Sequence, residues 1–147
     1  MLRSGGTFVI QAEERTFTET SGAGTYTASV AVPAGGWLLD IIIHGVAVWN
    51  NGGTVVGAIG ISGTATAYFD ITSLKAAGDL VAAESISFSE TGGENGTLQA
   101  TNYARYSATA RTVLGVITSD GAGGTTGRTR MLVIWAQPSS STAAAKT

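Results

Sequence analysis

The side chain best suited to acid–base chemistry occurs once, because His44 is the only histidine in the chain. It follows Asp40 in an apolar run, and on a β-strand these two side chains would point to the same side. Four residues of strand separate them by about 13 Å, which is beyond hydrogen-bond reach. A partner for His44 must therefore come from another strand, and we interpret His44 as a structural or interface residue.

The remaining residue types give little support for a catalytic or metal site. The chain has no cysteine, so a zinc site would depend mostly on carboxylates, which is unusual. No Ca²⁺-binding loop motif and no G-x-S-x-G nucleophile motif is present. A carboxylate pair for glycan cleavage would have to converge in space from Asp40, Asp70, Asp79 or Glu84. We expect no metal, no cofactor and no enzymatic activity.

The composition excludes several classes of protein. Ala, Gly, Thr and Ser make up 77 of the 147 residues, and 44% of the chain is hydrophobic, so a core can form. The formal net charge of −2 argues against nucleic-acid binding, which needs a basic surface. No apolar run approaches the roughly 18 residues of a membrane-spanning helix, so we expect no membrane partner.

Alternation with a period of two residues predicts an all-β protein. Apolar and polar residues alternate over 25–32 and 84–90, and β-branched residues dominate the other candidate strands. These others are 7–12, 37–49, 54–62, 63–69, 97–108, 109–119 and 128–136. Met131–Trp135 is apolar on both faces, which is typical of a central strand covered on both sides. Only Asp70–Ala83 has a helical pattern.

Turn signals separate these strands at regular intervals. Clusters rich in Gly, Asn and Pro occur at Pro33–Gly36, Asn50–Gly53, Thr91–Gly96 and Asp120–Gly124. The pattern predicts an antiparallel two-sheet sandwich that is jelly-roll-like, with at most one short helix. We divide the chain into an N-terminal arm with the first strand (1–20), the sandwich (21–138) and a C-terminal tail (139–147).

Several features favour contact with other chains. The many Ala and Gly residues supply little core volume, so burial between subunits would help to stabilise a monomer of this kind. Trp49 adjoins Asn50 and Asn51 in a predicted loop, where it suits either a sugar or protein contact or a cap on the core. Arg128 and Arg130 share one strand face, which suits either interface ion pairs or a solvated surface.

Three stretches together resemble a known group of proteins. They are Val32–Ile41 (VPAGGWLLDI), Ala76–Asp79 and Thr112–Val133, the last of which contains a glycine-rich loop. In this order they are similar to small jelly-roll virion proteins of tailed bacteriophages, over about residues 25–137. Some proteins of that group are capsid cement or decoration proteins, and others sit on tails or fibres. The resemblance carries no catalytic motif.

The resemblance implies a structural protein on the outer surface of a tailed-phage head, which binds the major capsid protein and bridges capsid subunits. The alternative is a tail- or fibre-associated module that binds a receptor or a glycan. A homo-oligomer is expected, with a trimer favoured by the quasi-threefold sites of such lattices and a dimer as the second choice.

The two chain ends are expected to act as arms. Ordering about ten residues of the Ser/Ala-rich tail costs on the order of 10 kcal/mol in backbone entropy, which its own burial cannot offset. Contacts with another chain would have to supply the difference. The expected capsid or subunit contacts are Leu2, Arg3, Phe8, Ile10, Arg15, Trp49, Asn50, Asn51, Arg128 and Arg130.

Overall fold

Strands and turns build the part of the chain that the structure, a computed structural model, describes: residues 7–22, 24–78, 80–88, 97–98 and 105–139. No helix occurs among these residues. The strands are β1 (Phe8–Thr18), β2 (Gly24–Val32), β3 (Trp37–Ala47), β4 (Val55–Ile61), β5 (Thr64–Ile71), β6 (Ser85–Ser87), β7 (Thr97–Leu98), β8 (Arg111–Ser119) and β9 (Arg128–Pro138).

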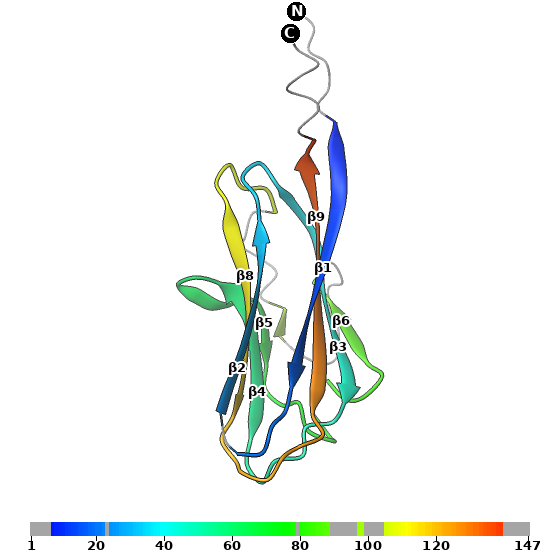
Figure 1. The fold of residues 1–147 in the computed structure, drawn as a ribbon, viewed down its shortest axis with the longest axis vertical. Coiled ribbons are helices and arrows are strands. Elements are labelled where there is room, and N and C mark those ends of the chain that lie inside the picture. The colour runs from blue at the N-terminus through cyan, green and yellow to red at the C-terminus, as the bar shows by residue number, and fades with distance from the viewer. Residues whose placement is uncertain (1–6, 23, 79, 89–96, 99–104, 140–147) are drawn as a thin grey trace, which may run out of the picture.

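These strands form two facing antiparallel sheets (Figure 1). The first sheet has the order β1-β9-β3-β6, and the second has the order β2-β8-β4-β5-β7. Successive strands pass from one sheet to the other except at the β4–β5 hairpin and between β7 and β8, which both belong to the second sheet. This order is that of a jelly roll, so the predicted fold class is confirmed.

The core lies between the two sheets. On β3, Leu38, Ile41 and Ile43 are each at most 1% exposed, and they belong to one buried cluster with Val113 and Ile117 of β8, an interior strand of the second sheet. One face of each long strand therefore supplies the core, as the alternation predicted.

The turn at Pro33–Gly36 shows how local sequence ends β2 and starts β3. The N–H of Gly36 donates to the carbonyl oxygen of Pro33 at 3.0 Å, and Gly35 has a φ of 77°. Gly35 is the third residue of this four-residue turn, where a type II turn requires a positive φ that glycine adopts without strain. The predicted cluster at Thr91–Gly96 lies outside the described residues.

The expected helix over Asp70–Ala83 is not formed, and the described residues of this segment end β5 and then make turns. Their backbone groups bond to distant strands and loops. The N–H of Leu74 donates to the carbonyl oxygen of Val55 at 3.0 Å, and the N–H of Ala83 donates to that of Gly45 at 2.7 Å. These tertiary bonds use donors that a helix would need for its own turns.

Two strand predictions need correction. β1 extends to Thr18 instead of ending near residue 12, because every residue of it pairs with β9, from Phe8↔Pro138 to Thr18↔Arg128. Of the predicted strand over 97–108, only 97–98 and 105–108 are described, and Tyr106 makes a single bridge to Trp37. Long-range pairing, which local sequence does not encode, sets both boundaries.

Candidate interaction surface

The groups that could do acid–base chemistry are each held by a serine of β6. Asp40 and His44 do share the outer face of β3, as expected. His44 Nδ1 lies 2.7 Å from Ser85 Oγ, and Asp40 Oδ2 accepts a hydrogen bond from Ser87 Oγ at 2.7 Å. The serines therefore tie β6 to β3 through two separate contacts.

Metal-binding and membrane-spanning features are lacking in the described part of the chain. No three or more His, Cys, Asp or Glu side chains gather there in a group that could hold a metal ion. No helix among these residues is long and apolar enough to cross a membrane.

An open groove of about 520 Å³ lies beside the end of β2, and Arg111 is the only charged residue among the described residues that line it.

A buried carboxylate organises one end of the sandwich. Glu19 is 3% exposed and accepts hydrogen bonds from the backbone N–H groups of Asn50 (3.1 Å), Asn51 (3.2 Å) and Gly127 (2.8 Å). The N–H of Glu19 also donates to the carbonyl oxygen of Gly127 at 2.8 Å. The loop after β1 is thereby joined to the β3–β4 and β8–β9 loops, which makes this end a rigid polar network.

Trp49 belongs to the core and caps it at this end. It is 1% exposed, its ring packs edge-on against Tyr26 with 5.1 Å between centroids, and its Nε1 donates to Thr129 Oγ1 at 2.9 Å. Of the two roles left open by the sequence, the structure supports the cap. A ring this deeply buried offers no platform to a sugar or a partner.

The two asparagines after Trp49 are also used within the chain. Asn51 is 2% exposed, and its Nδ2 donates to Ser119 Oγ and to the carbonyl oxygen of Thr54. Asn50 is exposed, but its Oδ1 accepts from the N–H groups of Thr125 (3.0 Å) and Thr126 (3.3 Å). Burial therefore argues against Asn51 as a contact residue, since its side chain completes the loop network.

Asp120 and Lys75 extend this network toward solvent. Asp120 accepts from the side chain of Thr54 at 2.8 Å and from its N–H at 2.5 Å, and these two bonds hold the pKa of the carboxyl below its ordinary value. Lys75 Nζ donates to the carbonyl oxygens of Asn51 (2.5 Å) and Gly53 (2.8 Å). The loop carbonyls are thus satisfied within the chain.

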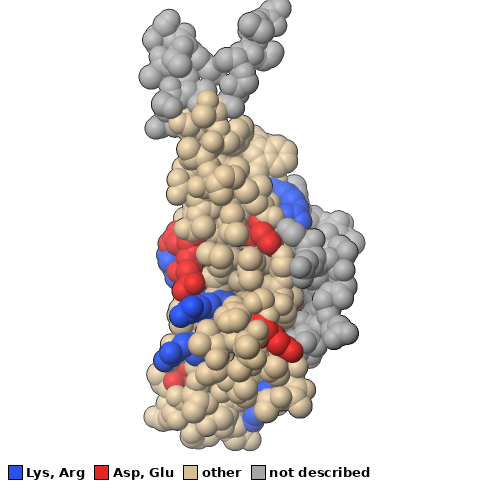
Figure 2. Space-filling model, turned by 90° about the vertical axis from the view of Figure 1, so that its right-hand side faces the viewer, with Lys and Arg blue, Asp and Glu red and all other residues tan. Residues whose placement is uncertain are grey.

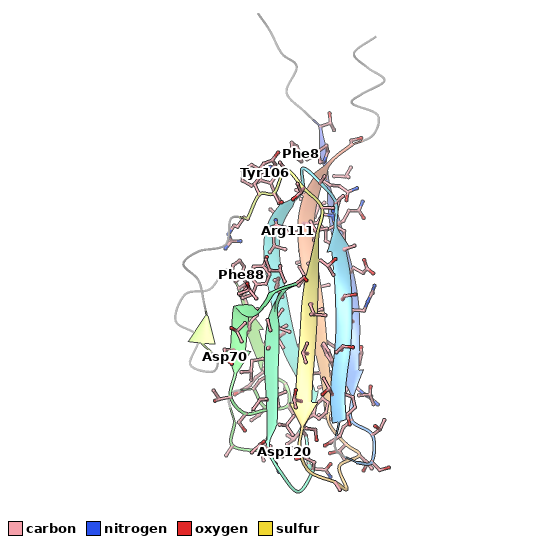
Figure 3. All side chains as sticks on the ribbon, turned by 90° about the vertical axis from the view of Figure 1, so that its left-hand side faces the viewer. Phe8, Asp70, Phe88, Tyr106, Arg111 and Asp120 are labelled. Carbon is pink, nitrogen blue, oxygen red and sulfur yellow. The ribbon has the colours of Figure 1, made fainter. Side chains whose placement is uncertain are left out.

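The opposite end of the molecule is apolar. Here β1 and β9 extend beyond the strands of the second sheet (Figure 1), and Phe8, Val9 and Ile10 are 47%, 37% and 64% exposed. Val9 lies on the same side of β1 as buried Phe17, so its exposure shows that nothing in the described chain covers this stretch. Figure 3 shows Phe8 and Tyr106 at this end and Asp120 at the other. We call Phe8–Ile10 the projecting end.

A second apolar surface covers the outer side of the first sheet. β9 is an interior strand of this sheet. Within its apolar run, Met131, Val133 and Trp135 face the core, while Leu132 and Ile134 face outward and are half-buried. The prediction that this strand is covered on both sides is therefore wrong for the isolated chain. The outer face is made by Ile10, Ala12, Trp37, Leu39, Ile42, Leu132, Ile134 and Ala136.

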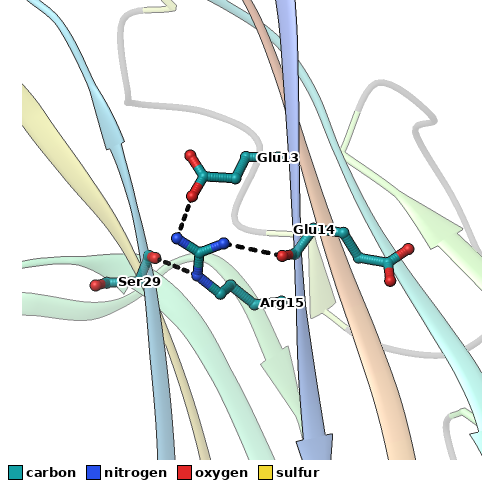
Figure 4. A network of polar contacts seen from close by, with 4 residues as sticks. All are labelled: Glu13, Glu14, Arg15 and Ser29. Carbon is teal, nitrogen blue, oxygen red and sulfur yellow. Dashed lines mark hydrogen bonds and ion pairs between the residues drawn. The ribbon is translucent and has the colours of Figure 1, made fainter.

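The arginines lie beside these apolar surfaces. Arg15 donates from Nε to the carbonyl oxygen of Ser29 at 3.0 Å and pairs with Glu13, so it links the edge strands β1 and β2 within the chain (Figure 4). Arg130 lies 3.6 Å from Glu14, and both are about half exposed. Arg128 and Arg130 share the outer face, as expected, and are exposed.

Of the other expected contacts, Leu2 and Arg3 lie outside the described residues, as do residues 140–147 of the tail. Sequence reasoning missed Trp37 and Tyr106, which are 46% and 43% exposed with ring centroids 4.9 Å apart. It also missed Leu132 and Ile134. Both residues belong to the run that is apolar on both faces, a pattern that by itself predicts a strand covered on both sides.

Comparison with solved structures agrees with the topology. The fold is shared with chains of two bacteriophage capsid structures. One is the acidic stable capsid structure of Helicobacter pylori bacteriophage KHP30, with a TM-score of 0.54, 17% identity, and coverage of 92% of this chain and 95% of that chain. The other is the cyanophage Pam1 capsid asymmetric unit, with a TM-score of 0.52, 19% identity, and coverage of 91% and 87%.

Each of these similarities spans nearly the whole of both chains, so the likeness is one of complete domains. No protein-family model matches the chain, and no curated protein sequence matches it.

Proposed function

We propose that this chain is a structural virion protein, a cement or decoration protein that binds the outside of a tailed-phage head. In this role it contacts the major capsid protein and stabilises the shell by bridging capsid subunits. The observation that carries the proposal is the projecting end, where Phe8, Val9 and Ile10 stand exposed on a paired but uncovered ribbon. The fold likeness to chains of two phage capsid structures supports the same role.

The projecting end suits docking for two physical reasons. A two-stranded ribbon beyond the cover of the opposite sheet is marginally stable alone, so burial against a partner would stabilise it. β1 is also the edge strand of its sheet, and an exposed apolar edge is a site where another chain can pair or pack. The opposite end has its polar groups satisfied by the Glu19 network and lacks this character.

Only the outermost residues of the chain can act as arms. Residues 8–18 belong to the chain's own sheet, so only residues 1–6, with Leu2 and Arg3, and the tail after Ser139 can reach over neighbouring subunits. Both segments continue from the projecting end, because Phe8 pairs with Pro138.

We expect a trimer at quasi-threefold positions, or else a dimer, and no catalytic activity or cofactor. Trp49, the feature that suggested a tail-borne glycan-binding module, is buried, so we do not favour that alternative.

The test is binding to heads assembled from the cognate major capsid protein without this chain. We expect the purified protein to coat such heads and to raise their disruption temperature. Phe8→Lys should weaken binding about tenfold or more, since an apolar anchor would be replaced by a charge. Val56→Lys, at a 39% exposed position of the second sheet, is the matched control and should bind normally. Absence of coating, or equal losses in both variants, would contradict the proposal.

A further inference from the structure

We infer that the outer face of the first sheet packs against the same face of other copies of this chain. This inference does not depend on the capsid role, because the contact forms between identical chains in solution. The face is centred on β9, where Leu132 and Ile134 point away from the core and are half-buried, and Ala136 on the same side is 9% exposed. It adjoins the projecting end, with which it shares Ile10, and Phe8 points to the same side of β1 as Ile10.

The register of the strands sets the shape of this face. Ile10 of β1, Ala136 of β9 and Trp37 of β3 lie side by side in one row across three strands. The next row contains Ala12, Ile134 and Asp40, and Asp40 accepts a hydrogen bond from Ser87. Small alanines beside large side chains allow another sheet to approach closely, as in the sheet-on-sheet packing that already builds the core.

Exposed apolar side chains are concentrated on this side of the molecule. Among the described residues, seven large hydrophobic side chains are exposed, and only Val56 belongs to a strand of the second sheet. Trp37 (46%) and Leu39 (38%) are on the outer face, and Tyr106 packs on Trp37. Apolar patches of this kind on a soluble domain mark interaction sites.

The area is sufficient for a stable association. Three strands of eleven residues form most of the face, and at about 4.8 Å between strands and about 3.4 Å per residue they cover about 500 Å² in projection. Two such faces together reach about 1,000 Å², which is the lower limit of the area expected of a specific interface.

The charges on the face favour an identical partner. Glu14 and Asp40 contribute acidic groups, and Arg128 and Arg130 contribute basic groups on the same face. Figure 2 shows both signs on this side, with an uncharged region extending above them. A face with balanced charges does not repel its own copy, because each acid of one copy can lie near a base of the other.

The mass of the full chain in solution tests the inference. By light scattering from about 1 to 100 µM, we expect two or three times 14.8 kDa. Leu39→Lys should raise the dissociation constant about a hundredfold, because a charge would be buried at the contact. Val56→Lys has nearly the same exposure (39% against 38%) on the other sheet and should leave the mass unchanged.

A second pair and a fluorescence measurement keep the outcome clear. Leu132→Lys and Leu114→Lys change half-buried, outward-facing leucines on interior strands of the two sheets, and only the first should dissociate the oligomer. Circular dichroism melting shows whether each variant folds. Trp37 is the exposed tryptophan of the isolated chain, since Trp49 and Trp135 are 1% and 6% exposed. The fluorescence of Trp37 is obtained by subtracting the signal of a Trp37→Phe variant from that of the wild type. Quenching of this fluorescence by acrylamide should therefore rise several-fold on dissociation.

Three results would overturn the inference. The first is a wild-type chain that remains monomeric at 100 µM. The second is equal dissociation by Leu39→Lys and Val56→Lys. The third is a Leu39→Lys variant that keeps its mass but loses capsid binding, which would assign the face to the capsid protein instead.

Discussion

The carboxylate of Glu19 accepts a hydrogen bond from the backbone N–H of Gly127 at 2.8 Å, although 108 residues separate the two in the chain. Together with the bonds from Asn50 and Asn51, this contact joins three loops at one end of the jelly roll. The polar end is therefore held together internally, and the apolar surfaces lie elsewhere on the molecule.

Glu19→Ala should lower the free energy of unfolding by about 3 kcal/mol, because three backbone donors lose a charged acceptor in a buried site. Urea denaturation measures this change. Glu14→Ala is the control, since its carboxylate forms an exposed ion pair with Arg130 and should cost less than about 0.5 kcal/mol. Equal effects of the two substitutions would show that the buried network is not a main source of stability.

Gly127→Ala should destabilise the fold by about 3 kcal/mol through steric overlap. A Cβ at this position would lie 2.5 Å from Trp49 Cγ and 2.8 Å from Glu19 Oε2, and neither neighbour has room to move. The comparison is Gly24→Ala, whose added Cβ would meet nothing within 4 Å. Thermal melts of the two variants should separate clearly, and a Gly127→Ala protein as stable as Gly24→Ala would contradict the packing.

Asp120 should make the fold sensitive to acid. Its pKa is lowered by hydrogen bonds from Thr54, so the unfolded chain binds more protons than the native chain as the pH falls below about 4. The contribution of this group is therefore complete above that pH and is lost as the pH falls through the native pKa. In urea titrations between pH 2 and 7, Asp120→Asn should show a smaller acid-induced loss of stability than the wild type. Parallel curves would mean that the Thr54 contacts do not favour the charged form.

A chain that ends at Ser139 should fold as stably as the full chain, to within about 0.5 kcal/mol. The N–H of Ser139 donates to the carbonyl oxygen of Thr7 at 2.8 Å, and the Phe8–Pro138 pairing is retained. Capsid binding should fall, because the proposed arm is removed. A chain that ends at Gln137 loses the Thr7 bond and should melt lower. Unchanged capsid occupancy and heat protection after loss of residues 140–147 would remove the tail from the mechanism.

Local sequence predicts most of the strands but few of the residues that could contact another chain. The alternation around Val30 and Val32 identifies β2, and both side chains are buried. Phe8 and Ile10 are exposed, and their role as contacts with the capsid or another subunit stays a prediction. Trp49 and Asn51 could not be placed, because Glu19, about thirty residues earlier, binds the loop that contains them and draws it onto the core.

By itself, the sequence determined that this chain forms strands, where most of its turns fall, and that Met131–Trp135 is apolar on both faces. The tertiary structure decided which of those two faces meets the opposite sheet and which remains open. A period of two residues separates the faces of a strand but does not identify its neighbours. Those neighbours come from distant parts of the chain: β9 lies between β1, which begins at Phe8, and β3, and one layer of opposing sheet can cover only one side of it.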